Sequence, residues 1–206
     1  MSQPQPDARF DLSGGNLALD FANTVSNRPA ENRTERLAEY QNLVAFGRET
    51  GALPVRAVDR LYAVAGEAPG QGKSILHGAI QLREAIFDIF SAVAERRTIP
   101  VRSLALLNIA LQKSAPHGRI VHTSRRFVWE WIGMDCYLDS ILWPVARAAA
   151  DLLTSEDIAK VRICASDKCA WLFLDQTKNH RRRWCDMKTC GNRVKAQRHY
   201  QRVKSI

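Results

Sequence analysis

Cys164-Ala-Ser-Asp-Lys-Cys169 is followed, fifteen residues later, by a second stretch with the same cysteine spacing, Cys185-Asp-Met-Lys-Thr-Cys190. Zinc prefers four ligands in a tetrahedron, and two cysteines about two to four residues apart can turn both sulfurs toward one ion. The sequence therefore predicts one structural Zn2+ bound by Cys164, Cys169, Cys185 and Cys190. Disulfides and free thiols are the alternatives that this spacing leaves open.

The residues between and after the two pairs indicate the form of this zinc module. We expect a strand over 170–174, a turn over 175–180, a returning strand over 181–184 and a final helix from Cys190 to about Lys204. A loop, a hairpin and a helix that share one metal define a treble-clef or zinc-ribbon-like finger. Four thiolates leave no open coordination position, so the ion is expected to be structural and not catalytic. The module has few large apolar residues, and metal binding would compensate for such a small core.

The charge of the chain is concentrated in the same segment. Residues 162–206 contain 12 Lys and Arg against 3 Asp and Glu, whereas residues 1–161 contain 18 of each. Such a run is often only a solvated surface, but its confinement to a metal-ordered module favours binding to nucleic acid. On the final helix, Lys195, Arg198 and Arg202 follow one stripe. The candidate nucleic-acid-binding residues are Arg181, Arg182, Arg183, Arg193, Lys195, Arg198 and Arg202.

DNA is the favoured partner, although RNA is possible because Trp171, Phe173 or Trp184 can stack on bases. A structural role in the core of the finger explains these aromatic residues equally well. No feature of the sequence specifies a target site.

The region before the finger is predicted to be mainly helical with one small β-hairpin. Hydrophobic periodicity, capping residues and prolines predict helices over 16–25, 34–48, 54–65, 75–96, 101–112 and 136–153, the last bent at Pro144, and a loop over 67–72. The β-branched and aromatic runs 119–123 and 126–132 predict the hairpin. Cys136 is expected to be a core residue.

The termini and the apolar stretches bear on location. The first residues have neither a basic nor an apolar region, which argues against a secretory signal. The most apolar stretch, 137–153, is interrupted by Asp139, Arg147 and Asp151, so no membrane span is expected. We therefore expect a cytoplasmic protein, in which cysteine pairs more often bind metal than form disulfides.

Asp20 and Asn23 are three residues apart and share one helix face, so they could line a pocket in the N-terminal region. A helix cap or a buried hydrogen bond explains them equally well. The sequence has no nucleophile elbow, phosphate-binding glycine loop, dinucleotide fingerprint or zinc-protease helix. We therefore expect that the protein is not an enzyme.

Two sets of motifs resemble known families. Phe173-Leu-Asp175, Arg182-Arg-Trp-Cys185 and Cys190-Gly-Asn-Arg193, together with the cysteine spacings, resemble the CGNR zinc finger. Gly14-Gly15-x-Leu-x-Leu-Asp20-Phe-x-Asn23-Thr24 resembles the ABATE domain that commonly precedes this finger. The resemblance implies a bacterial, stress-induced transcription regulator. It also implies three parts: a polar tail over 1–9, an ABATE-like domain over 10–158 and a CGNR-type finger over 159–206.

The leading hypothesis is a regulator whose finger binds DNA and whose N-terminal domain senses a small ligand or forms a homo-oligomer. In a first alternative, the basic finger docks an acidic partner protein. In a second, the activity is small-molecule binding or catalysis in the N-terminal domain, near Asp20, Asn23 and the tryptophans.

Overall fold

The computed structural model of the chain describes residues 10–204, without the side chains of Arg198 and His199, so the predicted tail over 1–9 lies outside it. The α-helices of this part are α1 (Leu17–Ala22), α2 (Tyr40–Glu49), α3 (Val55–Glu67), α4 (Pro69–Ala94), α5 (Val101–Ser114), α6 (Leu142–Leu153) and α7 (Asn192–Lys204). The strands are β1 (Val25–Ser26), β2 (Thr34–Glu35), β3 (Gly118–His122), β4 (Phe127–Trp131), β5 (Val161–Ile163) and β6 (Leu172–Leu174).

The strands form three separate antiparallel pairs, β1–β2, β3–β4 and β5–β6. The fold is thus mainly helical with small hairpins and a C-terminal cluster of four cysteines, as predicted.

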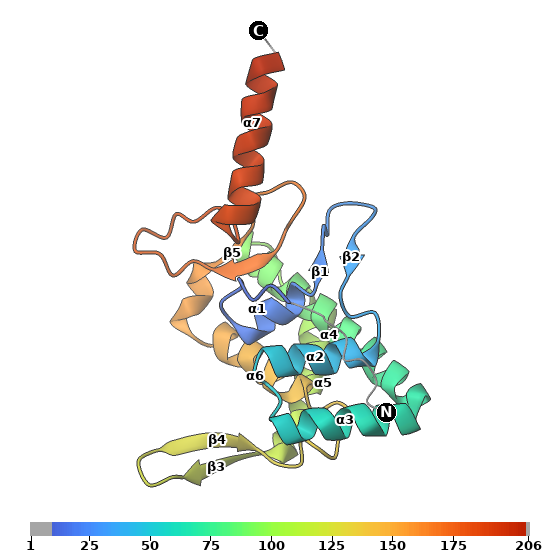
Figure 1. Ribbon diagram of the computed structural model, residues 1–206. Coiled ribbons are helices and arrows are strands. Elements are labelled where there is room, and N and C mark those ends of the chain that lie inside the picture. Colours follow the sequence, from blue (N-terminus) through green and yellow to red (C-terminus); the bar gives the residue numbers. More distant parts are fainter. Residues whose placement is uncertain (1–9, 205–206) are drawn as a thin grey trace.

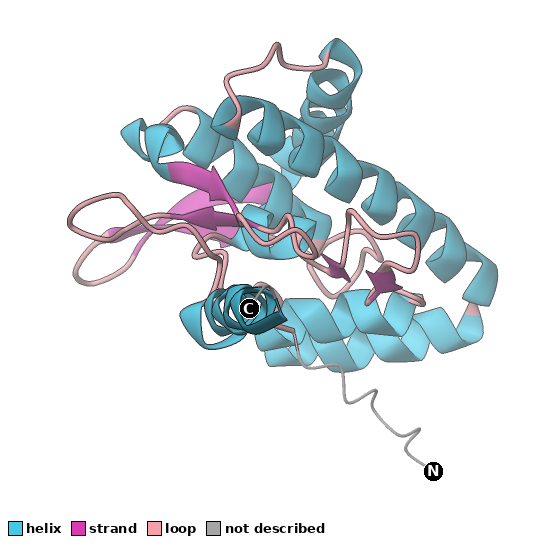
Figure 2. Ribbon diagram, turned by 90° about the horizontal axis from the view of Figure 1, so that it is seen from above, coloured by secondary structure: helices cyan, strands magenta, loops and turns pink. Residues whose placement is uncertain are grey.

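The 26-residue helix α4 is the centre of the fold (Figure 1). It packs against α1, α2, α3 and α5, and also against strands β5 and β6 (Figure 2). Its inner face carries Ile86, Ile89 and Phe90, which are almost completely buried with Phe21 and Phe46 of neighbouring helices. Burial of this face provides the main hydrophobic stabilisation of the domain.

The prediction of a loop over 67–72 was wrong, because α4 begins at Pro69. Proline suits the first turn of a helix, where its missing N–H is not needed. Gly72 lies within this first part of the helix and faces Tyr40, and a Cβ at Gly72 would come 3.3 Å from the Tyr40 Cβ.

Two other predicted helices begin later than expected. Thr34 does not cap a helix; it pairs with Ser26 in the β1–β2 hairpin, and α2 begins at Tyr40, where Glu39 and Asn42 form a capping box. Helix α6 begins at Leu142, so Pro144 lies in its first turn and does not bend it.

The predicted hairpin of β3 and β4 is confirmed, with Ile120 opposite Trp129. It projects from the helical body (Figure 1) and leaves Ile120 and Phe127 68% and 72% exposed. Cys136 lies in the segment between β4 and α6 and is exposed, so its expected place in the core was wrong.

A buried ion network fixes the β1–β2 hairpin to α4. The Arg83 guanidinium, which is 3% exposed, donates to both carboxylate oxygens of Glu35 at 2.6 and 2.8 Å. It also contacts Glu84 at 2.8 Å, and Arg28 contacts Glu84 at 2.7 Å. Burial alone would raise the pKa of Glu84, but the hydrogen bonds and charges of Arg28 and Arg83 hold it below its usual value.

The finger shares a core with the helices. Val161, Leu172 and Leu174 of the β5–β6 hairpin belong to the same apolar cluster as the helical domain. The hairpin of the finger is formed by β5 and β6, which flank the first cysteine pair. The predicted returning strand over 181–184 was wrong, since these residues have no regular structure.

The N-terminal motif binds β6, whose other edge pairs with β5. The Asn23 side chain donates to the Leu172 carbonyl at 2.8 Å and accepts from the Leu172 N–H at 2.9 Å. The Leu174 N–H donates to the Gly14 carbonyl at 2.9 Å, and the Trp171 Nε1–H donates to the Val25 carbonyl at 2.8 Å. The amide of Asn23 therefore replaces one residue of a neighbouring strand.

A search of the described helices for a membrane span finds no segment that is both long enough and apolar enough.

We expect Asn23→Ala to lower the free energy of unfolding by about 2–4 kcal/mol, because two buried backbone groups of Leu172 would lose their partner. Chemical denaturation measures this loss. Asn108→Ala, an exposed change on α5, is the control and should change stability little. Equal effects of the two substitutions would contradict the proposed role of Asn23.

Candidate metal centre and nucleic-acid interface

Cys164, Cys169, Cys185 and Cys190 are all buried, and their sulfur atoms lie within 4.8 Å of one another. The Cys169 and Cys185 sulfurs are 3.6 Å apart, and the Cys185 and Cys190 sulfurs are 3.7 Å apart. A tetrahedral zinc with bonds of about 2.3 Å requires sulfur separations of about 3.8 Å. These separations are too long for disulfides, whose sulfurs lie about 2.05 Å apart. The four sulfurs therefore fit one structural Zn2+, as predicted.

The close approach of the four sulfur atoms also indicates why this site needs a cation. The pKa of Cys185 is raised above its ordinary value, because hydrogen bonding with the Cys164 and Cys169 sulfurs favours its protonated form and because it is buried. Hydrogen bonds from the Cys169 and Cys185 thiols lower the pKa of Cys164. A divalent ion stabilises all four cysteines as thiolates, because its charge offsets the repulsion between them.

Each cysteine pair is held by an adjacent structural element. Cys164 directly follows β5, and Cys169 lies just before β6, so the β5–β6 hairpin brings the first pair together. Cys190 lies in a π-helical turn over Met187–Gly191 that leads into α7. Asp186 begins this turn by accepting from the Thr189 N–H at 2.8 Å.

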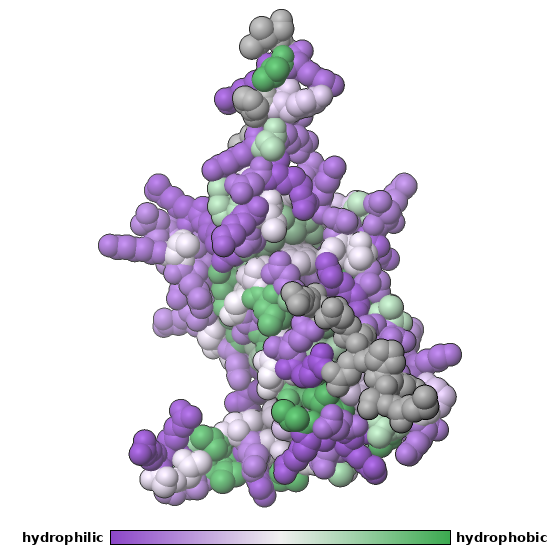
Figure 3. All heavy atoms as spheres, in the orientation of Figure 1, coloured by the Kyte–Doolittle hydropathy of each residue, from purple (hydrophilic) through white to green (hydrophobic). Residues whose placement is uncertain are grey.

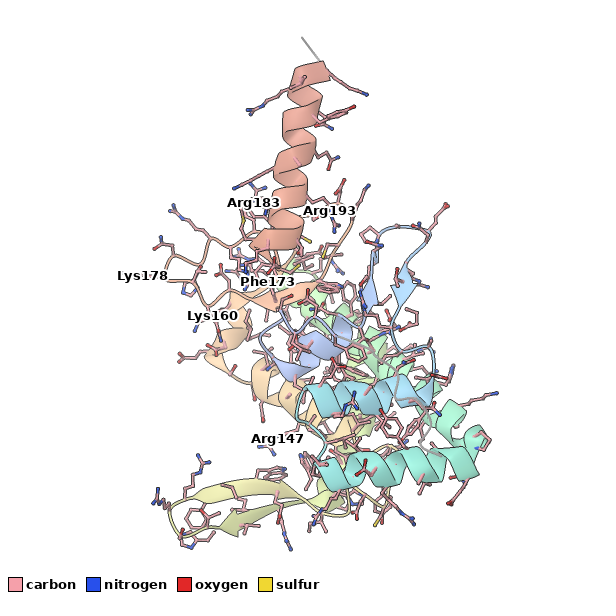
Figure 4. All side chains as sticks on the ribbon, in the orientation of Figure 1. Arg147, Lys160, Phe173, Lys178, Arg183 and Arg193 are labelled. Atoms are coloured by element: carbon pink, nitrogen blue, oxygen red, sulfur yellow. The ribbon has the colours of Figure 1, made fainter. Side chains whose placement is uncertain are left out.

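The Gly-Asn-Arg residues after Cys190 continue the turn into α7. A Cβ at Gly191 would come 2.5 Å from the Met187 sulfur, so glycine permits this close approach. The Asn192 side chain donates to the Lys188 carbonyl at 3.2 Å, which places it at the start of the helix. The Arg193 side chain is exposed at the base of α7 (Figure 4).

Asp175 organises the loop that connects β6 to the second cysteine pair. Its buried carboxylate accepts from the Thr177 hydroxyl at 2.5 Å and from the Arg182 backbone N–H at 2.8 Å. Burial would raise the pKa of Asp175, but these hydrogen bonds hold it below its usual value. The loop thereby takes one conformation that leaves Lys178, Arg181 and Arg183 exposed.

Arg182 has its hydrogen-bond partners inside the finger. Its guanidinium donates to the carbonyls of Trp184 and Cys185 and lies 4.6 Å from the centre of the Phe173 ring. These contacts fix the chain beside Cys185, so we leave Arg182 out of the proposed interface and assign it a structural role.

Helix α7 stands away from the helical domain (Figure 1), and its residues Val194, Gln197 and Gln201 line a shallow pocket together with Ala165 and Asp167 of the finger. Lys195 and Arg202 are exposed on it, whereas the side chain of Arg198 lies outside the described part. Arg183 and Lys178 lie on one side of its base and Arg193 lies on the other (Figure 4). Figure 3 shows that the surface of this region is mostly hydrophilic.

Asp20 and Asn23 lie at the joint between the helical domain and the finger. Asp20 accepts from the Gly14 N–H at 2.8 Å, and Asn23 binds Leu172 as described above. Burial raises the pKa of Asp20 to about 6. A Cβ at Gly14 would come 2.7 Å from the Asp20 Oδ1, which explains the glycine. Neither Asp20 nor Asn23 lines the cavities described below.

Two further cations lie beside the metal centre although the sequence did not single them out. Arg36 follows β2, and Lys168 lies between the first two cysteines. Lys168 directly precedes Cys169 in the sequence, so its place beside the metal centre could have been predicted. Arg36 is more than 120 positions from the finger, and nothing local indicates that it meets the finger.

The described part of the chain thus consists of a helical domain joined to a four-cysteine zinc finger with a basic, projecting helix. Comparison with known families finds that residues 15–156 match ABATE, described as "Putative stress-induced transcription regulator". Residues 160–203 match the CGNR zinc finger. The chain therefore belongs to the ABATE family and carries a CGNR zinc finger. A search of curated proteins finds no match.

We expect Cys185→Ser to abolish stoichiometric zinc binding and to unfold the finger, because three thiolates no longer complete the tetrahedron. Elemental analysis of the reduced protein and hydrogen exchange over residues 160–204 measure the two effects. Cys136→Ser is the matched control, since Cys136 is exposed and lies outside the cluster. It should keep one zinc per chain; loss of zinc from both variants would contradict this assignment.

Proposed function

We propose that this protein is a cytoplasmic transcription regulator that binds DNA through its zinc finger and helix α7. The main observation behind this proposal is that α7 projects from the helical domain and the finger with five Lys and Arg residues and no acidic residue. The residues concerned are Arg193, Lys195, Arg198, Arg202 and Lys204. The description of the ABATE family supports a role in transcription.

The shape of α7 supports insertion into the major groove of DNA. Its 13 residues span about 20 Å, and a helix with its side chains is about 10–12 Å wide. The major groove has a comparable width of about 12 Å. Most of the described side chains of α7 are exposed, and a helix of this length is marginally stable by itself in water, so binding to a polyanion would stabilise it.

The cations at the base of α7 support contacts to the phosphates on both sides of such a groove. Lys178 and Arg183 lie on one side and Arg193 on the other (Figure 4). The zinc centre holds these segments together, because Cys185 and Cys190 lie between them in the chain. Phosphate contacts of this kind set the position of a protein on DNA, whereas base contacts from α7 would set the sequence.

The burial of the aromatic residues of the finger favours DNA over RNA as the partner. Trp171 and Phe173 are 8% and 0% exposed, and Trp184 is partly buried against the same cluster. These rings pack around the cysteines and do not form an open platform for stacking bases, as single-stranded RNA binding would require.

We expect the zinc-loaded protein to bind duplex DNA with an affinity that falls steeply with salt, by about 0.9 in log K per phosphate contact. Lys195→Gln should reduce this slope by about 1 and weaken binding to different sequences similarly. Fluorescence anisotropy over a series of salt concentrations measures both quantities.

Arg102→Gln, an exposed change on α5, is the control and should leave the slope unchanged. Absence of salt-dependent DNA binding would contradict the proposal. A protein partner that still co-purifies after nuclease treatment would then favour docking to an acidic protein.

We also propose that the N-terminal domain senses a small amphipathic ligand, because a cavity of about 380 Å3 lies between α4, α5 and the start of α6. Leu82, Leu106 and Trp143 contribute apolar walls, and the lining also contains the Lys113 ammonium and the Asp139 carboxylate. The Trp143 indole N–H is buried without a hydrogen-bond partner. Such a cavity suits an apolar ring system that carries an anionic group and a hydrogen-bond acceptor.

We expect the fluorescent anion 1-anilinonaphthalene-8-sulfonate to bind the native protein at one site in this cavity. Ala110→Phe would fill the cavity and should abolish this binding. The control is Ala105→Phe on the exposed face of the same helix, and it should preserve the binding. A fluorescence titration measures the stoichiometry, and equal binding by both variants would contradict the proposed site.

A further inference from the structure

A second cleft, of about 290 Å3, lies where the β1–β2 hairpin faces the zinc finger. The hairpin contributes Ser26, Asn27, Thr34 and Arg36, and the finger contributes Lys168, Thr189 and Arg193, beside three of the four cysteines. The hairpin rises next to the base of α7 (Figure 1), so the cleft opens beside the proposed DNA-binding helix. Its two walls come from segments more than 130 positions apart in the chain.

The charge of the cleft is strongly positive. Arg36, Lys168 and Arg193 are exposed, and none of the three forms an ion pair with an acidic side chain in the described structure. The acidic residue in the lining is Asp11, whose carboxylate accepts from the Ser13 N–H. Elsewhere in the described helical domain, arginines such as Arg83 and Arg119 are paired with glutamates.

The groups in the cleft match the chemistry of a phosphate. Guanidinium groups donate two parallel hydrogen bonds to phosphate oxygens, and a lysine ammonium adds a point charge. The Thr34 hydroxyl is an additional donor on the hairpin wall, whereas the Thr189 hydroxyl donates to Asp186 at 3.3 Å. The volume of about 290 Å3 lies just below the range of about 300–1,000 Å3 that is typical of ligand cavities, which suits a group as small as one phosphate.

Contacts on both sides hold the cleft in shape. Glu35, which lies between Thr34 and Arg36, accepts from both terminal guanidinium nitrogens of the buried Arg83. Trp171 in the floor of the cleft donates to the Val25 carbonyl of β1. The hairpin and the finger are therefore positioned before any ligand binds, which lowers the entropic cost of binding.

We propose that this cleft binds a backbone phosphate of the same DNA that α7 engages, clamped between Arg36 of the N-terminal domain and Arg193 and Lys168 of the finger. This inference rests on the proposed function and adds the N-terminal domain to the DNA-binding surface. The DNA then lies against both domains, so a change in the helical domain can alter DNA affinity directly.

The test compares two arginines of the same hairpin in the full-length, zinc-loaded protein. Arg36→Gln should weaken binding to duplex DNA about three- to tenfold and lower the salt slope by about 1, because one phosphate contact is lost. Arg33→Gln removes an equal charge from an exposed position that does not line the cleft. It should have a clearly smaller effect on both quantities.

A double-mutant cycle tests the shared phosphate more strictly. Arg36→Gln and Arg193→Gln should be non-additive, because both side chains bind one group. Arg36→Gln and Lys195→Gln should be additive, since Lys195 does not line the cleft. Thermal unfolding of every variant, expected to match that of the original protein, separates these effects from loss of folding.

The outcomes separate the two proposals. Native protein that binds DNA, with equal effects of Arg36→Gln and Arg33→Gln, would overturn the cleft inference and leave the proposed function intact. Native protein that does not bind DNA would overturn both. In a further arm, saturable binding of inorganic phosphate that Arg36→Gln abolishes, without DNA binding, would assign the cleft to free phosphate and overturn the DNA assignment.

Discussion

The arrangement of this protein depends on how the second edge of strand β6 is satisfied. One edge pairs with β5, and the other would leave buried backbone groups without partners. The Asn23 amide supplies both a donor and an acceptor to Leu172, and the Gly14 carbonyl accepts from Leu174. These bonds seat the hairpin of the finger on the helical core, where Leu172 and Leu174 are buried. The position of the metal centre relative to the N-terminal domain follows from this joint.

The metal and the helical core stabilise different parts of the finger. The β5–β6 hairpin is buried against α4, whereas the loop over 175–184 and the turn before α7 have few apolar contacts. The four sulfurs and the Asp175 and Arg182 hydrogen bonds organise this second part. Basic side chains need no burial, so they can surround a small centre of this kind. The finger therefore combines a rigid metal centre with a positively charged surface in a short stretch of chain.

Local features of the sequence predicted the metal centre and much of the helical domain. The two Cys-x4-Cys stretches, the hairpin of β3 and β4 and the long helix α4 all depend on residues close in the chain. The motif around Asp20 and Asn23 was recognised, but its hydrogen bonds to β6 involve partners about 150 positions away. Thr34 lies in a strand because it pairs with the nearby Ser26 and because its neighbour Glu35 is bound by Arg83 of α4, a contact that the local sequence does not indicate. The intramolecular contacts of Arg182 could not be read from a run of three arginines.

The joint between Asn23 and Leu172 also affects how the chain can fold during synthesis. The two residues are 149 positions apart. The surface around α1 and Asn23 that later binds β6 therefore leaves the ribosome long before β6 does. Translation at about 5–20 residues per second leaves this surface uncovered for many seconds. During that interval the nascent helical domain exposes an unpaired amide and apolar side chains, which is a state that chaperones recognise. Completion of the fold is thereby delayed until β6 has emerged.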